Sequence, residues 1–373
     1  MRRLAILALS SLCLLINAQN KCETEAHYLE LMQKYPEYAL AKSKVNVQIQ
    51  QWINNSTNNN VEKIILIPVV VHVVWNSSVE NISDAQIYSQ IDVLNKDFRK
   101  SNIDQINTPA TWQNIAADCE IEFCLATIDP NGNTTTGITR TQTNALSFAV
   151  QGDAVKSSSS SGIDAWDNNK YLNIWVCNLA GGVLGYATPP VSSWAPPEDG
   201  VVVGYENFGT IGTAKSPYHK GRTTTHEIGH WLNLEHLWGA VGSCGDDQVA
   251  DTPKQETQNF SCPSFPHNPN ACGTSNQNGD MYMNFMDYTN DGCMTLFTLG
   301  QKQRMIATIN QFRTSLYYNN CNDPLNIPNK EMTSAKIVKV VDILGRTIDE
   351  KRKNLLKFFI YESGIVEKRM IIE

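Results

Sequence analysis

The run HEIGHWLNLEH, residues 226–236, constrains this chain more than any other feature of its sequence. Residues four apart lie on one face of a helix, so His226 and His230 can direct both imidazoles at one point. Glu227 follows the first of them and is close enough to reach a water molecule on the same metal. Two nitrogen ligands, a general base and room for solvent together predict a zinc hydrolase.

The third histidine of this run makes the pattern more specific. His236 lies more than one helical turn past His230, so it completes the site only if the helix ends and the chain turns back. Asn233 stands where that turn falls, and asparagine readily adopts the left-handed conformation that ends helices. An amphipathic helix with surface histidines is the alternative. Three of the seven histidines of the chain fall in this one run, which favours zinc.

The N-terminus indicates a secreted protein. Met1 to Ala18 is typical of a signal peptide, because two arginines precede an apolar stretch and Ala18 suits cleavage. The stretch is short for a membrane anchor, and Cys13 lacks the small residues that precede a lipidated cysteine. No later segment predicts a stable membrane span. The net charge of −7 argues against nucleic acid as a partner.

Changes in composition divide the rest of the chain. Residues 19–60 are polar, favour helices and end in an asparagine-rich linker, which suits a pro-segment. Over residues 61–322, strands and helices alternate at first and an irregular half follows, which predicts one α/β or α+β domain. The expected strands are residues 64–75, 121–128, 171–177 and 200–205, and the expected helices are one capped by Ser83 and one over 299–317. Pro68 indicates that the first strand is an edge strand or contains a bulge.

Several stretches between Ile64 and Tyr317 resemble the pappalysin (cytophagalysin-like) family of metzincin metalloproteases. They are IPVVVHVVW, IEFCLA, GITR, YLNIWVCNLAGGVLGYA, DGVVV, TTTHEIGHWLNLEHLWG, DTPKQ and NFMDYTNDGCMTLFTLGQKQRM. The resemblance implies a mixed twisted sheet, a zinc-binding active-site helix and an irregular, disulfide-bonded C-terminal subdomain. The family usually has glycine where this chain has Asn233, and asparagine adopts the required positive φ at modest cost.

The resemblance also implies roles for individual residues. The implied zinc ligands are His226, His230 and His236, and Glu227 is the implied general base. Met286 corresponds to the methionine of the Met-turn, an apolar floor beneath the metal. Tyr288 corresponds to a tyrosine near the metal that helps to stabilise the oxyanion. A core methionine and a loop tyrosine are the alternative interpretations.

Ten cysteines need partners or roles. Loss of Cys13 with the signal peptide leaves an odd number, and Cys22 resembles the family's cysteine that occupies the zinc and keeps the enzyme latent. A free or disulfide-bonded Cys22 is the alternative. The resemblance implies the disulfides Cys244–Cys272 and Cys262–Cys293, although the sequence alone allows three pairings. A second zinc site is disfavoured because close CxxC pairs are missing. The pairing of the other four cysteines stays open: Cys119, Cys124, Cys177 and Cys321.

The loop after the zinc motif carries oxygen ligands suited to calcium, which family members bind here. The candidates are Asp247, Asp251 and Thr252, and a solvated acidic turn is the alternative. Some relatives favour a basic residue just after the cut, read by an acid beside the second Met-turn cysteine. In this chain Gly292 precedes that cysteine and Asp291 stands one step earlier, so the sequence leaves this preference open.

The last segment, residues 329–373, alternates apolar and polar residues with a break at Leu344-Gly345-Arg346, which is typical of a small all-β module. It resembles the C-terminal sorting domain of the type IX secretion system. That resemblance implies a partnership with the secretion machinery and export across an outer membrane. A substrate-binding β-module is the alternative.

Together these features predict a secreted or cell-surface zinc metalloendopeptidase that is made as a latent zymogen and acts on proteins or peptides. A zinc-activated water, with Glu227 as general base, would hydrolyse the peptide bond. Two alternatives are a gluzincin-type peptidase, which uses a downstream glutamate as third ligand, and a non-catalytic zinc-binding adhesin. His236 and Met286 argue against the first, and a latency segment argues against the second.

Overall fold

The computed structural model describes residues 21–55, 64–190, 196–239, 243–317, 321, 337–342, 346–349, 356–361 and 366–370. The signal peptide expected at residues 1–18 lies outside these ranges. Contacts divide the chain into two compact units, residues 1–321 and residues 322–373. None of the described helices is both long enough and apolar enough to cross a membrane.

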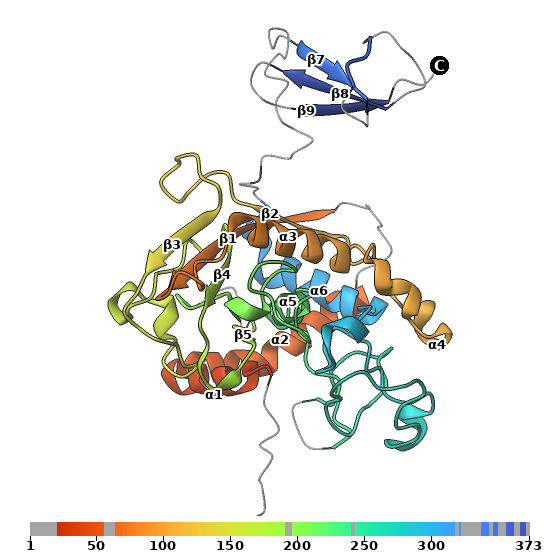
Figure 1. The fold of residues 1–373 in the computed structure, drawn as a ribbon. Coiled ribbons are helices and arrows are strands. Elements are labelled where there is room, and N and C mark those ends of the chain that lie inside the picture. The colour runs from red at the N-terminus through yellow and green to blue at the C-terminus, as the bar shows by residue number, and fades with distance from the viewer. Residues whose placement is uncertain are drawn as a thin grey trace, which may run out of the picture. The chain divides into compact units, whose positions relative to one another are not determined.

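The first unit is built on a six-stranded mixed sheet, shown in Figure 1. Its strands are β1 (Ile65–Trp75), β2 (Ile121–Leu125), β3 (Ile138–Gln142), β4 (Leu172–Cys177), β5 (Gly185–Ala187) and β6 (Val201–Gly204). The order is β2-β1-β4-β6-β5, and β3 continues along β1 beyond β2. All pairs are parallel except β5 with β6, which is antiparallel. The expected mixed sheet is therefore confirmed, and β5 forms an edge.

Pro68 does not mark an edge strand, so that expectation is wrong. β1 lies inside the sheet, between β2 and β4. Ile65 and Val71 donate their amides toward β2 and β3, so by alternation the nitrogen of Pro68 faces the β4 side. Pairing with β4 begins only at Val69. The missing N–H of proline therefore costs the ladder no hydrogen bond.

The helices are α1 (Thr24–Lys34), α2 (Pro36–Asn55), α3 (Asp84–Phe98), α4 (Ala110–Gln113), α5 (Arg222–Trp231) and α6 (Leu299–Phe312). Short 3₁₀ turns are η1 (Ile103–Asn107), η2 (Ala154–Lys156), η3 (Ser158–Ser160), η4 (Ala180–Gly182), η5 (Tyr205–Asn207), η6 (Gly273–Asn276), η7 (Asp291–Cys293) and η8 (Thr314–Tyr317). Ser83 caps α3 by accepting from the Gln86 amide, as predicted. The Gln86 side chain does not return the bond, because it donates to Phe208 and Thr213 instead.

The core lies on both faces of β1, since its β-branched residues alternate between them. Ile67 and Val71 belong to the main cluster, which includes residues of α3, α5 and α6. Val74 belongs to a second cluster with Trp175. The N-terminal segment that forms α1 and α2 joins this framework, because α1 contacts β5 and α2 contacts α6 (Figure 1). The zinc-motif helix α5 packs against β5, β6 and α3.

Three disulfides hold the first unit. Cys244 pairs with Cys272 and Cys262 with Cys293 across the irregular region after α5, as the family resemblance implied. Cys124 pairs with Cys321, which the sequence left open. Cys119 and Cys177 are free, buried thiols. The irregular region after α5 is expected to bury little apolar surface. The disulfides therefore restrain its backbone where side-chain packing is sparse.

One buried histidine predicts an acid-sensitive core. The ring of His72 on β1 contacts Thr139 and Asn173, and burial lowers its pKa from 6.5 to about 4. The folded state therefore binds a proton at His72 less readily than the unfolded state does. The free energy of unfolding is unaffected by this difference above pH 6.5 and falls as the pH drops from 6.5 toward 4. The loss amounts to roughly 3 kcal/mol. Urea unfolding of a His72→Gln variant at pH 7 and pH 4.5 should show a weaker pH dependence than the parent. Identical pH dependence would contradict the assignment.

The second unit contains a three-stranded antiparallel sheet in the order β7-β8-β9. Its strands are β7 (Ile337–Val341), β8 (Leu356–Tyr361) and β9 (Val366–Met370). Arg346 donates to the buried Asp342, the residue that follows β7. The described elements of this unit are strands, as expected for an all-β module. Leu344 and Gly345, where the sequence pattern breaks, lie outside the described residues.

Candidate active site

The helix α5 and the turn that follows it bring the three histidines of the motif together. α5 ends at Trp231, and Asn233 has a φ of 69°, in the left-handed region expected for the turn. The amide of Leu234 then bonds back to the Gly229 carbonyl at 2.9 Å, which reverses the chain. Arg304 of α6 donates its Nε to the Asn233 carbonyl at 2.6 Å. His236 is thereby returned to the face of the helix.

The three imidazoles converge through their Nε2 atoms. The distances are 3.1 Å for His226–His230, 3.2 Å for His226–His236 and 3.0 Å for His230–His236. Three nitrogens bound tetrahedrally to one zinc would lie about 3.3 Å apart. Each Nδ1 faces an acceptor, which is the Phe285 carbonyl, the Leu234 carbonyl or the Glu25 carboxylate. The Nε2 lone pairs therefore point at one another, an arrangement that a cation stabilises.

The protonation of the ligands suits a metal. Burial, with His236 nearby, lowers the pKa of His226 to about 3, and the same causes lower that of His230. Both rings are neutral at physiological pH, as metal ligands must be. The Cys22 sulfur completes the group, and all four ligand atoms lie within 4.8 Å of one another. Burial and the Glu227 carboxylate raise the pKa of the Cys22 thiol, so it becomes a thiolate only beside a cation.

The segment around Cys22 occupies the edge of the sheet. It runs parallel to β5, with the Leu184 amide donating to the Lys21 carbonyl at 2.9 Å and the Glu23 amide donating to the Gly185 carbonyl at 3.2 Å. Thr24 connects Glu227 of α5 with Ala187 of β5. Its hydroxyl donates to Glu227 at 2.9 Å and accepts from the Ala187 amide at 2.8 Å.

Glu227 is buried beside the converging histidines. Burial raises its pKa to about 8, although hydrogen bonds from Cys22 and Thr24 oppose that rise. Both of those donors use Oε2. Within the described part of the chain, Oε1 has no hydrogen-bond donor although it is buried. It is therefore an acceptor available to a water molecule.

Met286 lies directly beneath the helix, as the Met-turn requires. It is fully buried, and a Cβ added to Gly229 would come within 2.4 Å of its sulfur. Gly229 is therefore needed for this close approach, a role that the sequence alone did not reveal. The only hint was a small residue between two metal-binding positions.

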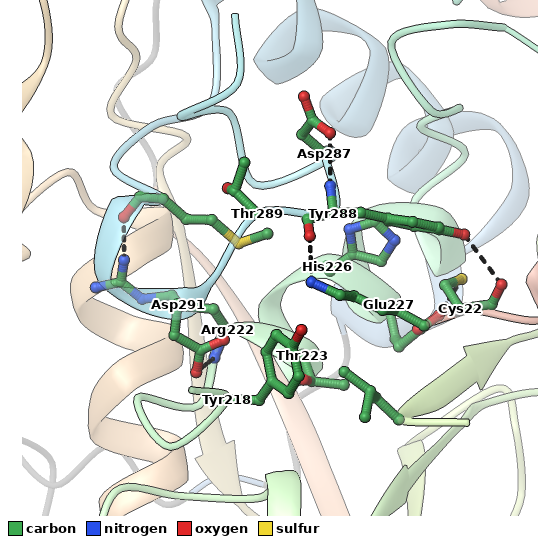
Figure 2. A pocket seen from close by; sticks show the side chains of 13 residues that line it. Cys22, Tyr218, Arg222, Thr223, His226, Glu227, Asp287, Tyr288, Thr289 and Asp291 are labelled. Carbon is green, nitrogen blue, oxygen red and sulfur yellow. Dashed lines mark hydrogen bonds between the residues drawn. The ribbon is translucent and has the colours of Figure 1, made fainter. Parts of the chain in front are cut away.

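Tyr288 reaches the site from the same turn, as Figure 2 shows. Its hydroxyl donates to the Cys22 carbonyl at 3.0 Å, and its ring centroid lies 5.0 Å from that of His236. Burial raises the pKa of the phenol, so the group remains a hydrogen-bond donor. In this structure that donor is occupied by the backbone of the segment around Cys22.

A pocket opens beside Glu227 and His226, and Lys21 enters it. The Lys21 ammonium donates to the Tyr288 carbonyl and lies 4.3 Å from the Tyr218 ring centroid. Burial lowers its pKa to about 8, while Asp291 and Asp287 oppose that fall. Asp291 is buried and accepts from the Lys220 amide at 2.7 Å at the start of α5. The acid that the sequence left in question therefore does line this pocket (Figure 2).

The calcium candidates lie apart from the histidines and already have donors. Asp247 accepts from the Thr252 hydroxyl at 2.8 Å and from the Val249 amide. Asp251 accepts from Thr298 and from the Gly300 amide at the start of α6. The first turn of α6 is thus anchored to this loop.

Behind α5 lies a buried ion pair that the sequence pattern did not reveal. Arg313 donates to both oxygens of Asp199, at 2.8 and 3.0 Å. Its guanidinium stacks 3.7 Å from the Trp231 ring and also contacts the Trp231 carbonyl. Charged residues far apart in sequence give no local signal of such a pair. It fixes the C-terminal end of the zinc-motif helix.

A mixed sheet, a helix with two histidines, a third histidine after a tight turn and a methionine floor define a metal-dependent peptidase of the metzincin type. The peptidase M43 family, described as pregnancy-associated plasma protein-A, matches residues 156–310. An extracellular metalloprotease of Arthroderma otae is 30% identical over 255 residues, which cover 67% of this chain and 79% of that protein.

Solved structures extend the similarity. Mature mirolysin of Tannerella forsythia in complex with a cleaved peptide is 53% identical, covers 69% of this chain and 97% of its own, and gives a TM-score of 0.67. A mutant of Tannerella forsythia promirolysin is 47% identical, covers 81% of this chain and 98% of its own, and gives a TM-score of 0.72. The chain belongs to the M43 family of metalloproteases. Neither the gluzincin nor the adhesin alternative fits this membership.

Proposed function

We propose that this metalloprotease is a secreted, zinc-dependent endopeptidase that is made as a latent precursor. The observation that carries the proposal is the convergence of three histidine nitrogens on one point, with Cys22 and Glu227 beside it. Nitrogen ligands with this spacing fit zinc better than calcium or magnesium, which prefer oxygen. We assign His226, His230 and His236 as ligands, with Met286 as the floor.

When bound, zinc supplies a Lewis acid that lowers the pKa of a water molecule to about 7 and polarises the scissile carbonyl. The protein's own groups do the rest. Glu227 accepts a proton from the attacking water at its free Oε1 and delivers it to the leaving amine. The Tyr288 hydroxyl donates a hydrogen bond to the oxyanion once the Cys22 carbonyl has left the site. The β5 edge binds the substrate backbone through the groups that now hold Lys21 and Glu23.

The decisive experiment uses purified processed protein and a peptide library with and without a zinc chelator. We expect cleavage that the chelator abolishes and that zinc restores. The Lys21 side chain in a pocket lined by Asp287 and Asp291 supports a preference for a basic residue just after the cut. Mapping of the products tests that preference in the same run. Chelator-insensitive cleavage, or none, would refute the proposed function.

We propose that the segment up to the asparagine-rich linker, which ends at residue 60, keeps the enzyme latent. We propose residues 1–18 as signal peptide, 19–60 as pro-segment and 61–322 as catalytic domain. The promirolysin match covers 81% of this chain and the mature mirolysin match 69%, and the difference is close to the length of the proposed pro-segment. Cys22 would occupy the fourth zinc position and exclude water.

Replacement of Cys22 by alanine should therefore raise the activity of the unprocessed chain at least about tenfold, since the strongest zinc ligand of the segment is lost. Activation should remain partial, because Thr24 and Lys21 still occupy the cleft. Hydrolysis of a fluorogenic peptide by an unprocessed, gel-verified chain measures the effect. Cys119→Ala, which removes another buried free thiol, is the matched control. Equal activity of the two variants would contradict the assignment.

Calcium at Asp247, Asp251 and Thr252 remains a proposal. Burial raises the pKa of Asp247 to about 7, so a cation competes with a proton for this carboxyl. Calcium should therefore raise the melting temperature more at pH 8 than at pH 6. A shift that is absent at both values would leave the loop as a hydrogen-bonded acidic turn.

Secretion is supported by the relative named as an extracellular metalloprotease. We propose that the signal peptide starts export and that residues 329–373 act as a type IX sorting module. A chain truncated before Asn329 should retain peptidase activity but remain inside the cell envelope. Normal release of the truncated chain would refute the sorting role.

A further inference from the structure

A second pro-segment side chain is buried in the catalytic domain, apart from the metal site. His27 of α1 is fully buried. Its Nδ1 lies 3.0 Å from the Ala187 carbonyl and its Nε2 lies 2.6 Å from the Asp153 carboxylate. Its ring also contacts that of Tyr186, with centroids 4.9 Å apart. Both ring nitrogens thus face acceptors.

The socket around His27 is built by the catalytic domain. The two carboxylate oxygens of Asp153 have different partners there. Oδ1 accepts from the Tyr186 hydroxyl at 3.0 Å and pairs with the Lys156 ammonium at 3.0 Å, whereas Oδ2 contacts His27. Burial favours the neutral acid, but Lys156 and His27 hold the pKa of Asp153 well below its usual value. The carboxylate is therefore ionised, with one oxygen reserved for the pro-segment.

Removal of the pro-segment would take away the side chain that, within the described residues, contacts two acceptors at once. They are Oδ2 of Asp153 and the Ala187 carbonyl, since His27 lies within hydrogen-bond distance of both. A substrate that covers these acceptors without donating to them would leave them buried and unpaired, which costs free energy, more so for the charged one. A ligand that donates two hydrogen bonds would restore what His27 supplies.

The position of the socket relates it to the cleft. Lys21 precedes Cys22 and enters the pocket beside Glu227, whereas Thr24 and His27 follow Cys22 and reach Ala187 at the other end of β5. The side chains of Lys21 and His27 thus lie on opposite sides of the point at which the histidine nitrogens converge. If the Lys21 pocket accepts the residue after the cut, the socket accepts a residue before it.

We propose that the Asp153 socket is a substrate subsite for a histidine, lysine or arginine side chain a few residues before the cut, and that His27 is its built-in occupant in the precursor. This rests on the proposed endopeptidase function. The subsite selects side chains that donate to the Ala187 carbonyl and to Oδ2 of Asp153. Alanine and glutamate offer no such donors, so they leave the acceptors unpaired.

The test uses the processed enzyme and fluorogenic peptides with lysine fixed after the cut. Histidine, lysine, arginine, alanine or glutamate is placed at each of the second to fifth positions before the cut. We expect one position at which the basic residues raise kcat/KM about tenfold over alanine, the value of one hydrogen bond to a charged group. The gain should appear mainly in KM, because the socket is remote from the reacting bond.

Two variants separate the subsite from general damage. Asp153→Asn should abolish the basic preference before the cut and keep that for lysine after it. Tyr186→Phe removes only the bond to Oδ1, so it should keep both preferences. A flat profile on the parent enzyme overturns the proposal even if Asp153→Asn fails to fold, and so does a preference that survives Asp153→Asn. Absence of chelator-sensitive cleavage of every peptide would instead refute the endopeptidase function.

Discussion

A Glu227→Gln variant should bind its metal normally and lose peptide hydrolysis by about a thousandfold or more, the upper range for loss of a general base. Glutamine keeps the shape of the side chain and an oxygen that can accept from Thr24. It cannot take a proton from water or return one to the leaving amine. Because Glu227 is not among the converging ligand atoms, zinc content should not change.

Two measurements decide this prediction, namely kcat/KM on a fluorogenic peptide and zinc per protein by atomic spectroscopy. Glu235→Gln is the matched control, since Glu235 lies in the same motif but its nearest charged partner is Arg304, at 3.9 Å. The control should retain most of its activity. Equal losses in both variants, or loss of zinc from Glu227→Gln, would remove Glu227 from the role of general base.

An Arg313→Leu variant should lose about 3–5 kcal/mol of unfolding free energy, because it leaves the Asp199 carboxylate buried without its partner. The side chains of this pair are only 4% and 3% exposed. The variant also loses the stacking on Trp231 and the bonds to the end of α5. Urea unfolding followed by tryptophan fluorescence measures the change.

Arg140→Leu is the control for this effect. Its partner is Asp84, and the two side chains are 31% and 52% exposed, so its loss should stay below about 1 kcal/mol. Adding Asp199→Asn to Arg313→Leu should recover part of the stability, because the uncompensated charge is then gone. A double variant as unstable as the single one would show that packing, rather than charge, dominates.

The sequence predicted the elements whose signals are local. The helical spacing of His226 and His230, the turn residue Asn233 and the cap at Ser83 each follow from a few neighbouring residues. The β-branched run of the first strand was also correctly placed. Its position inside the sheet was not, because a proline without its N–H is harmless wherever that side of the strand has no partner.

Long-range pairings explain what the sequence could not supply. The Cys124–Cys321 disulfide joins residues separated by 197 positions, and no spacing rule connects them. The same holds for Asp199 with Arg313 and for Asp153 with His27. The sequence leaves the role of Asp291 open, because Asp291 stands one residue before the position that directly precedes Cys293. The 3₁₀ turn over Asp291–Cys293 nevertheless leaves it lining the pocket.

The contact between Gly229 and Met286 means that the residue type at one position limits the residue type at the other. Any side chain at Gly229 would meet the Met286 sulfur, so the methionine side chain or the turn that also carries Tyr288 would have to shift. A smaller residue at position 286 would make room for alanine at 229 but open a void beneath the ligands. A substitution at Gly229 should therefore be tolerated only with an adjustment of the Met286 side chain or a change at position 286. The missing Cβ of Gly229 is what allows the Met286 side chain to lie so close beneath the motif helix.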